Sequence, residues 1–315
     1  MIGYIARRLL QAVPVLFLGS VGVFLFIHAV PGDPAVTMSG LNATPVQVAA
    51  LRHRFGLDQP LVTQYVRWIT HVVRGDFGIA YVTPRPIAQL ILLRVPATLH
   101  LAVGTMLVMV VVGGPLGVFS AVRPAHPLSR LIALTNALAL ATPTFWLGIL
   151  LILVFAVFLH WLPPSGYVSI TENPIQSIRS LILPAITLGA WGTAILIRFL
   201  RASISESIGA EFVRVAYAKG LPEPAVVWRH VLKVSLLPVV TIMAVQFGYL
   251  LGGAVITEAV FGWPGLGRLM VDAIGSQDYL VVQGTMLLFV TTFIVINVLA
   301  DAACAFLNPR IRYGR

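Results

Sequence analysis

The chain has 315 residues, of which 58% are hydrophobic and only 10% are charged. A soluble domain has about 25% charged residues, so too few polar side chains are present here to cover a water-exposed fold. The net charge of +10 is typical of a membrane protein with basic cytoplasmic loops and does not indicate a nucleic-acid partner. The composition therefore excludes a cytosolic enzyme and a disordered chain, and predicts an all-α integral membrane protein.

Six segments are apolar and long enough to cross a bilayer, which takes about 20 residues. They are residues 9–30, 97–121, 131–159, 181–201, 235–257 and 281–307. The first is longer than the core of a signal peptide and lacks a clear cleavage site, so we interpret it as an uncleaved span. The third is long enough to tilt or kink, and Pro143 lies inside it. Close helix packing is indicated by glycines four residues apart, Gly113 with Gly117 and Gly248 with Gly252.

The basic residues predict which way the spans face. With the N-terminus inside, the inner connections and both ends of the chain hold thirteen of the 21 Lys and Arg residues. The two short outer loops hold only Arg179 and Arg268, and the remaining six lie in the long segment 31–96. A loop of that length crosses the membrane largely regardless of charge. Both termini are therefore predicted to be cytoplasmic.

The long outer segment is predicted to be helical, because apolar residues recur at helical spacing between Pro45 and Phe55 and between Pro60 and Val73. We divide the chain accordingly into three parts. Residues 1–30 form the N-terminal inner segment and first span, and residues 31–96 form an extracytoplasmic helical segment. Residues 97–315 form a core transmembrane domain with cytoplasmic helices at about 205–234.

The sequence lacks the motifs of several chemistries. It contains no phosphate-binding P-loop, no HExxH and no paired CxxC, and its seven His residues lack metal-ligand spacing. We therefore expect no catalytic residue and no metal site. The charged residues Arg198, Arg201, Glu258 and Asp301 lie near the ends of spans, where they can snorkel to the interface. If a solute crosses this bundle, the driving energy is expected to come from another protein.

The inner loop between the fourth and fifth spans predicts two short amphipathic helices. The first covers Glu211 to Lys219 and carries an apolar stripe of Phe212, Val215 and Ala216. Gly220 fits a left-handed helix stop, and a second short helix is expected from about Pro224 to Lys233. Such a pair can rest on lipid headgroups or dock into a groove on a soluble partner. The residue pattern leaves both interpretations open.

The stretch from Glu211 to Leu221 resembles the cytoplasmic coupling motif of binding-protein-dependent ABC importer permeases, most closely the dipeptide/oligopeptide/nickel family. The general motif is Glu-Ala-Ala, three residues, then Gly. Ala216 and Gly220 match it, whereas Arg214 and Val215 replace its leading Glu and Ala. Further similar stretches follow in order: Pro31–Pro34, Gly56–Pro60, Gly75–Gly78, Thr142–Gly148, Trp161–Pro163, Glu258–Gly267 and Asn308–Arg312.

The resemblance implies a type I ABC importer-like permease of the bacterial inner membrane. Its expected partners are a second homologous permease forming a heterodimer, two cytoplasmic ATPase subunits and an extracytoplasmic solute-binding protein. ATP and Mg would bind to the ATPase subunits, so no cofactor is expected on this chain. The implied substrates are short peptides, either dipeptides and oligopeptides or glutathione-like molecules. A nickel or metal-chelate importer of the same family is the alternative.

The resemblance also assigns site residues. The residues expected to couple to the ATPase are Glu211, Arg214, Ala216, Lys219, Gly220, Leu221 and Trp228. Phe261, Trp263 and Leu266 are expected either at an outer gate on the pathway or in an interfacial aromatic belt. Two other classes remain open, a self-sufficient secondary carrier or channel and a membrane-embedded enzyme. The first needs polar groups at mid-span, and these are sparse.

Overall fold

The computed structural model describes residues 2–29, 35–36 and 44–307. The matched stretches Pro31–Pro34 and Asn308–Arg312 lie outside the described residues. Four helical segments in the described part are long and apolar enough to cross a membrane without a sharp bend. They are built from α1 (Ile2–Ala29), α5 (Ile87–Val108) continuing through the π-helical η1 (Met109–Gly113) into α6 (Gly114–Val122), α9 (Pro174–Ile208) and α15 (Tyr279–Leu307).

Two further spans are bent pairs of helices. The first pair joins α7 (Pro127–Ala141) to α8 (Thr144–Leu151) and the π-helical η2 (Ile152–Phe158). The second runs from α11 (Glu223–Val226) through the π-helical η3 (Val227–Val231) into α12 (Leu232–Gly253). Counting each bent pair as one span gives six spans in the described residues. The six predicted spans are thereby confirmed.

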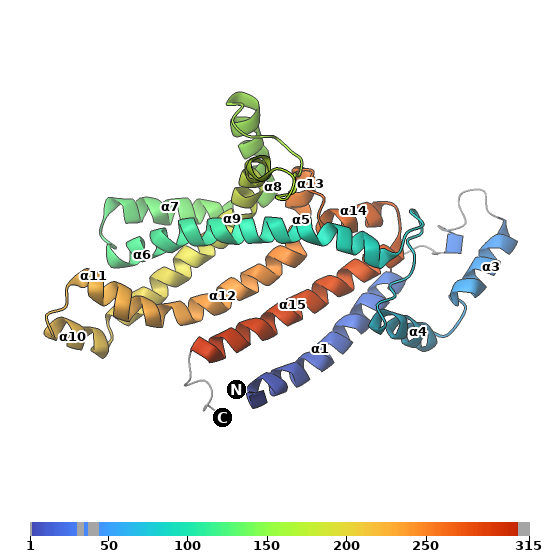
Figure 1. Ribbon diagram of the computed structural model, residues 1–315, viewed down its shortest axis with the longest axis horizontal. Helices are drawn as coiled ribbons and strands as arrows, with labels where there is room; N and C mark the ends of the chain where they lie inside the picture. Colours follow the sequence, from blue (N-terminus) through green and yellow to red (C-terminus); the bar gives the residue numbers. More distant parts are fainter. Residues whose placement is uncertain (1, 30–34, 37–43, 308–315) are drawn as a thin grey trace.

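The break in the third span coincides with Pro143, and it is sharper than a kink. Proline has no backbone N–H to continue a helix, and it biases the preceding residue toward an extended conformation. Thr142 is extended at φ −81° and ψ 124°, and the two helices meet at 109°. As a result, α8 and η2 project sideways from the bundle instead of continuing along α7 (Figure 1).

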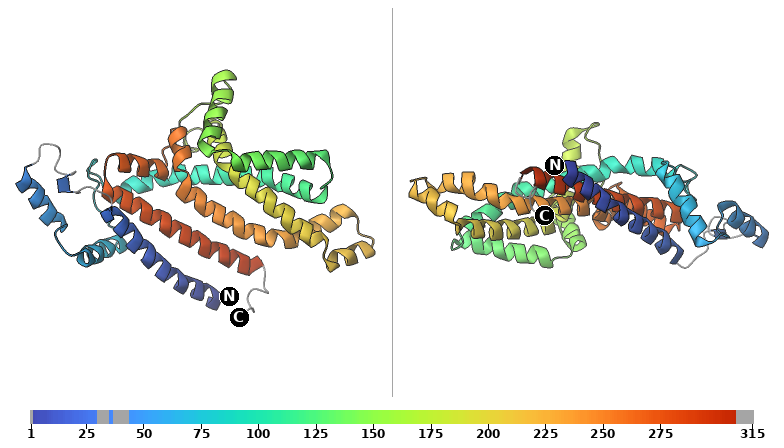
Figure 2. Two further views of the ribbon diagram at one scale, coloured as in Figure 1. Left: turned by 180° about the vertical axis from the view of Figure 1, so that it is seen from behind. Right: turned by 90° about the horizontal axis from the view of Figure 1, so that it is seen from below.

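The helices are arranged with two distinct ends. Helices α1 and α15 run antiparallel and side by side, as the views from in front and behind both show (Figures 1 and 2). The start of α1 and the end of α15 lie at the same end of the molecule as α10 (Glu211–Ala218), whereas α3 (Pro45–Phe55) and α4 (Leu61–Val73) lie at the opposite end. This arrangement agrees with the predicted topology, in which both termini and the 205–234 loop face inward.

The predicted glycine contacts are present. A Cβ atom at Gly117 would lie 3.0 Å from the Leu200 side chain, and a Cβ at Gly248 would lie 3.0 Å from Phe293. Gly117 lies on α6 against α9, and Gly248 lies on α12 against α15. At both crossings the absence of a side chain allows a large residue of the neighbouring helix to approach the backbone.

The outer segment contains the two predicted helices, α3 (Pro45–Phe55) and α4 (Leu61–Val73). Thr44 caps α3 through a capping box with Gln47, which is worth about 1 kcal/mol. His53, in the last turn of α3, is hydrogen-bonded through its imidazole to Asp58 beyond the helix and holds the pKa of that carboxyl below its usual value. Helix α4 packs on α1 through Tyr65, whose hydroxyl lies 2.7 Å from Ser20 Oγ.

The loop between α4 and α5 is fastened to α15 by one buried carboxylate. Asp278 is 3% exposed, and its Oδ2 accepts hydrogen bonds from the backbone N–H groups of Tyr81 at 2.7 Å and Val82 at 3.1 Å. Charge-assisted bonds of this kind are roughly twice as strong as neutral ones. They hold the end of the outer segment against the start of the last span.

Candidate functional site

The first candidate site is the inner hairpin, residues 211–231, which lies at the inner end of the bundle. Its first helix, α10, ends at Ala218, and after the capping residue Lys219, Gly220 adopts the left-handed conformation with φ 78°. The predicted helix stop is therefore confirmed. The second helix begins at Glu223 and runs straight through η3 to Leu236, three residues beyond its predicted end. At Pro238 the chain bends by 52° into the rest of α12, because proline interrupts the helical hydrogen bonds.

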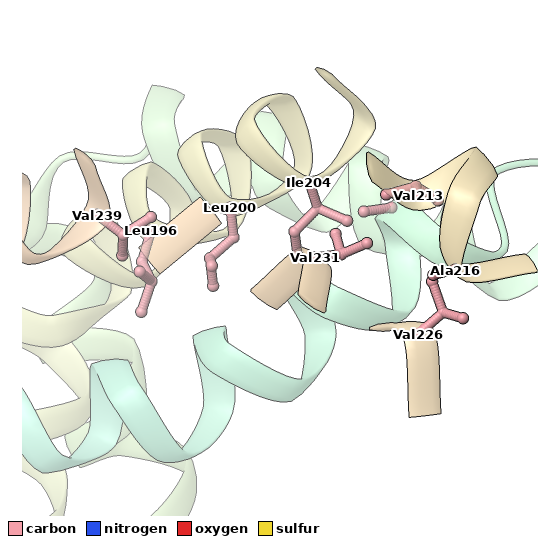
Figure 3. Close-up of a cluster of buried hydrophobic side chains, with 9 residues drawn as sticks. Leu196, Leu200, Ile204, Val213, Ala216, Val226, Val231 and Val239 are labelled. Atoms are coloured by element: carbon pink, nitrogen blue, oxygen red, sulfur yellow. The ribbon is translucent and has the colours of Figure 1, made fainter. Parts of the chain in front are cut away.

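The inner hairpin has a packed core shared with α9. Buried side chains of the hairpin meet buried side chains of α9 and α12 (Figure 3). These residues are Leu196, Leu200, Ile204, Val213, Ala216, Val226, Val231 and Val239. The three members of the predicted apolar stripe on α10 differ in their exposure. Val213 and Ala216 face the core, while Phe212 and Val215 are 40% and 49% exposed, because α10 meets α9 through the face carrying residues 213 and 216.

Serine side chains link the two helices that flank the hairpin. Ser203 Oγ on α9 donates to the Ser235 carbonyl on α12 at 3.0 Å, and Ser235 Oγ donates back to the Ser203 carbonyl at 3.2 Å. Ser207 Oγ lies 2.9 Å from Ser235 Oγ. Because Ser235 is buried, these bonds are shielded from water. The two helices that carry the hairpin are therefore joined to each other at its base.

A third contact joins the hairpin to the neighbouring inner loop. The Arg123 guanidinium, just after α6, lies 3.1 Å from the Glu223 carboxylate at the start of α11. Both side chains are more than 40% exposed, so solvent screening leaves this pair worth about 0–1 kcal/mol. The pair can help to orient the hairpin, but it contributes little to the stability of the fold.

The residues predicted to couple to the ATPase divide into two groups by exposure. Ala216 is buried and Leu221 is half-buried against the hairpin core. The others present their side chains or backbone to the surface: Glu211, Arg214, Lys219, Gly220 and Trp228. The exposed apolar side chains Phe212, Val215 and Tyr217 lie among them. The solvent-exposed face of α10, which points away from the hairpin core, is thus partly apolar.

The second candidate site is the outer hairpin, residues 255–275, formed by α13 (Val255–Val260) and α14 (Leu266–Gly275). Its centre is Glu258, which is fully buried. One carboxylate oxygen accepts a hydrogen bond from the Thr98 hydroxyl at 3.0 Å, and the other accepts from the Arg268 backbone N–H at 2.9 Å. Thr98 Oγ1 in turn accepts from the Leu266 N–H at 2.8 Å. Glu258 and Thr98 together cap the N-terminus of α14.

The glycines of this stretch leave room for that carboxylate. A Cβ atom at Gly265 would overlap the Glu258 carboxylate, and a Cβ at Gly267 would lie 2.7 Å from the Val255 backbone. Gly265 is in an extended conformation that any residue can adopt. The requirement for glycine there is therefore one of space and not of backbone conformation.

The three residues predicted at an outer gate or belt are all buried. Trp263 donates its indole N–H to the Ala97 carbonyl at 2.8 Å and packs edge-on against Tyr167. The Phe261 ring packs closely against Gly148, since a Cβ atom added at Gly148 would lie 3.2 Å from the ring. Leu266 packs in a cluster with side chains of α5 and α15. This burial is incompatible with an interfacial aromatic belt, whose side chains contact lipid headgroups.

Sequence reasoning missed the role of Glu258, which it treated as a residue at a span end that can snorkel. Its side chain is instead sealed inside the chain. The spacing of Gly265 and Gly267 after Glu258 was the available signal, since paired glycines mark a close approach. Asp301 was also treated as a lone terminal charge, but its carboxylate lies 3.1 Å from the Arg8 guanidinium, joining α15 to α1. No group of three or more metal-ligating side chains occurs among the described residues.

The inner hairpin, the six spans and the outer helical segment match a known family in two blocks. Residues 113–313 match the family described as binding-protein-dependent transport system inner membrane component. Residues 1–102 match the N-terminal region of the same class of transport proteins. The chain belongs to this family. It is a permease subunit of an ABC importer and an inner-membrane protein, as the resemblance predicted.

Relatives with assigned names are similar over their whole length. The permease is 43% identical over 316 aligned residues to the glutathione transport system permease protein GsiC of Escherichia coli, covering 99% of this chain and 100% of the relative. It is 42% identical over 313 residues to GsiC of Salmonella paratyphi A, with the same coverage. The alignment covers both hairpins and the outer helical segment.

A solved structure shares the fold. An inward-facing structure of the MetNI methionine ABC transporter aligns with a TM-score of 0.57 at 19% identity, covering 70% of this permease and 97% of the solved chain. At that identity the likeness establishes the type I importer permease fold and nothing about substrate. The predicted fold class is thereby confirmed.

Proposed function

We propose that this permease forms half of a translocation pathway for short peptides of the size and chemistry of glutathione. The observation that carries this proposal is the 43% identity to the glutathione permease over 99% of the chain. The absence of a three-ligand metal group among the described residues gives no support to the nickel alternative. A second homologous permease would supply the other half of the pathway, giving a heterodimer.

The inner hairpin is the proposed attachment point for two ATPase subunits that carry the ATP and Mg. Its exposed apolar side chains Phe212, Val215 and Tyr217 offer a surface that a groove on a soluble partner can cover. Glu211, Arg214 and Lys219 would form the charged rim of that contact. Because the hairpin core and the serine bonds fix it to α9 and α12, a partner that moves the hairpin also moves two spans.

The outer hairpin is the proposed gate element on the opposite side. Since Phe261, Trp263 and Leu266 are packed against α5 and α8, they would act by moving as a block and not by separate side-chain rotations. An extracytoplasmic solute-binding protein would deliver the peptide to this side. In this proposal residues 1–30 form the N-terminal inner segment and first span, residues 31–96 the extracytoplasmic helical segment, and residues 97–315 the core transmembrane domain.

The proposal is tested by copurification and transport. The tagged permease is purified in mild detergent, and its partners are identified by mass spectrometry. The recovered complex is reconstituted in liposomes with its binding protein and radiolabelled glutathione, an alanine dipeptide or Ni²⁺. We expect a second permease, P-loop ATPases and ATP-dependent glutathione uptake.

Three results would contradict the proposal. Uptake of Ni²⁺ but of neither peptide would overturn the substrate assignment. Uptake of the dipeptide alone would exclude glutathione-like substrates. Transport by this chain alone without ATP would overturn the proposed dependence on ATPase subunits.

A further inference from the structure

A cavity of about 500 Å³ lies at the outer ends of α1 and α15, where α4 and the loop before α5 enclose it. It is separate from both hairpins, since none of its lining residues belongs to them. Phe24 of α1 and Trp68 of α4 form an aromatic wall, with ring centroids 5.9 Å apart. The cavity is therefore a preformed site for an amphipathic molecule.

One side of the cavity carries a guanidinium group. Arg67 of α4 lies against Gly56, where an added Cβ would come within 2.7 Å of Arg67 Nη1. Gly56 has φ 68°, so the left-handed turn after α3 both ends that helix and makes room for the arginine. Within the part of the chain that the structure describes, the Arg67 guanidinium forms no ion pair with a carboxylate. Such a group is suited to bind a phosphate through two parallel N–H donors.

The loop before α5 contributes a carboxylate. Asp76 lines the cavity, and its Oδ1 accepts a hydrogen bond from the Gly78 N–H at 2.9 Å. Among the described residues no hydrogen bond or ion pair engages its other oxygen, which can accept from a cationic ligand group. Tyr81 lines the same side, and burial together with the nearby Asp278 raises the pKa of its phenol. The phenol therefore stays neutral, and Asp76 supplies the negative charge on this side.

The position of the cavity identifies its occupant. The two apolar spans beside it are residues 6–26 and 279–302, so Phe24 and Tyr279 place it at the outer ends of both. Leu25 and Phe26 next to it are 49% and 54% exposed, which leaves an apolar surface on α1 for acyl chains. We propose that this cavity binds the headgroup of an outer-leaflet phospholipid carrying a primary ammonium, with its phosphate on Arg67, its ammonium on Asp76 and its acyl chains along α1.

The proposal is tested by native mass spectrometry on the full-length chain in detergent after removal of bound lipid. Phosphatidylethanolamine, phosphatidylcholine and phosphatidylglycerol with identical acyl chains are titrated in turn. We expect tightest binding of phosphatidylethanolamine to one saturable site. Arg67→Gln removes the phosphate contact and is expected to weaken this binding about tenfold. Asp76→Asn is expected to abolish the preference for ethanolamine over choline.

Arg74→Gln is the matched control, because Arg74 follows the same helix and does not line the cavity. It is expected to leave lipid binding unchanged. Arg67→Lys keeps the positive charge but removes the paired N–H donors, so we expect an intermediate lipid affinity. Wild-type gel-filtration behaviour of this variant would show that the weaker binding comes from the lost contact and not from misfolding.

Two outcomes would overturn the proposal. Equal lipid binding by the Arg67→Gln and Arg74→Gln variants would show that the retained lipids lie elsewhere. Normal lipid binding by Arg67→Gln together with weaker capture of the solute-binding protein would assign the cavity to a protein contact.

Discussion

At the scale of single residues, Glu258 organises the outer hairpin. A buried carboxylate is stable only when its oxygens are hydrogen-bonded, and here Thr98 and the Arg268 N–H supply both donors. The same interaction ties α13, α14 and α5 together at one point. The carboxylate occupies space that any side chain at Gly265 would need.

We predict that Gly265→Ala destabilises the permease, whereas Gly275→Ala does not. The new methyl group at residue 265 must displace the Glu258 carboxylate and break bonds whose loss costs about 1–3 kcal/mol. At Gly275 a Cβ meets nothing within 4 Å, and alanine in a helix is favourable by up to about 1 kcal/mol. Melting temperatures in detergent measure the difference. Equal melting temperatures for the two variants would contradict the steric role given to Gly265.

The sequence predicts some individual residues better than others. Gly220 could be identified as a helix stop because the requirement for a positive φ is local and independent of the rest of the fold. The contacts of Glu258 could not be predicted, because Thr98 is 160 residues away in sequence. Only the folded chain shows that a charge near a span end is turned inward and not toward water.

At the scale of elements, the inner hairpin has one face that stabilises the fold and an exposed face that we propose as the docking surface. Val213 and Val215 make the difference measurable, because they are identical residues on one short helix with opposite surroundings. Val213 is 2% exposed and Val215 is 49% exposed. Their substitutions therefore separate folding from docking.

We predict that Val213→Ala lowers the free energy of unfolding by about 1–3 kcal/mol, because it leaves a cavity in the hairpin core. Val215→Ser is expected to leave stability within about 0.5 kcal/mol of wild type but to reduce copurification of the ATPase and ATP-dependent uptake. Thermal melting and quantitative pull-down measure the two effects. Undiminished ATPase recovery with Val215→Ser would place the docking surface elsewhere.

The helices themselves could be predicted from the sequence, but the angles at which some of them meet could not. Long apolar runs gave the spans, since about 20 such residues have no stable alternative to a membrane helix. The angle of 109° at Pro143 was not predictable, because the packing of Gly148 on Phe261 fixes where α8 goes. The bend of 52° near Pro238 has a sequence signal in that proline, but its angle has none, because the packing of α12 against α9 and α15 decides it.

At the scale of the whole molecule, the distribution of charge sets the orientation in the membrane. We predict that a cysteine at Val62, which is 75% exposed on α4, reacts with a membrane-impermeant maleimide added outside intact spheroplasts. A cysteine at Trp228, 64% exposed on the inner hairpin, should react only after the membrane is opened. Cys304 is the single native cysteine, so Cys304→Ser gives a clean background. The reverse labelling pattern would overturn the topology.

The length of α9 has a mechanical consequence. Its 35 residues form a rod about 52 Å long, which carries the inner hairpin at one end and reaches the outer face at the other. A tilt of 10° about its outer end would sweep the inner end through about 9 Å. The helix thus acts as a lever arm, and Pro184 is the one proline inside it. Under the proposed coupling, a displacement of a few ångströms at the cytoplasmic end would reach the outer face along α9 without a relay of side chains.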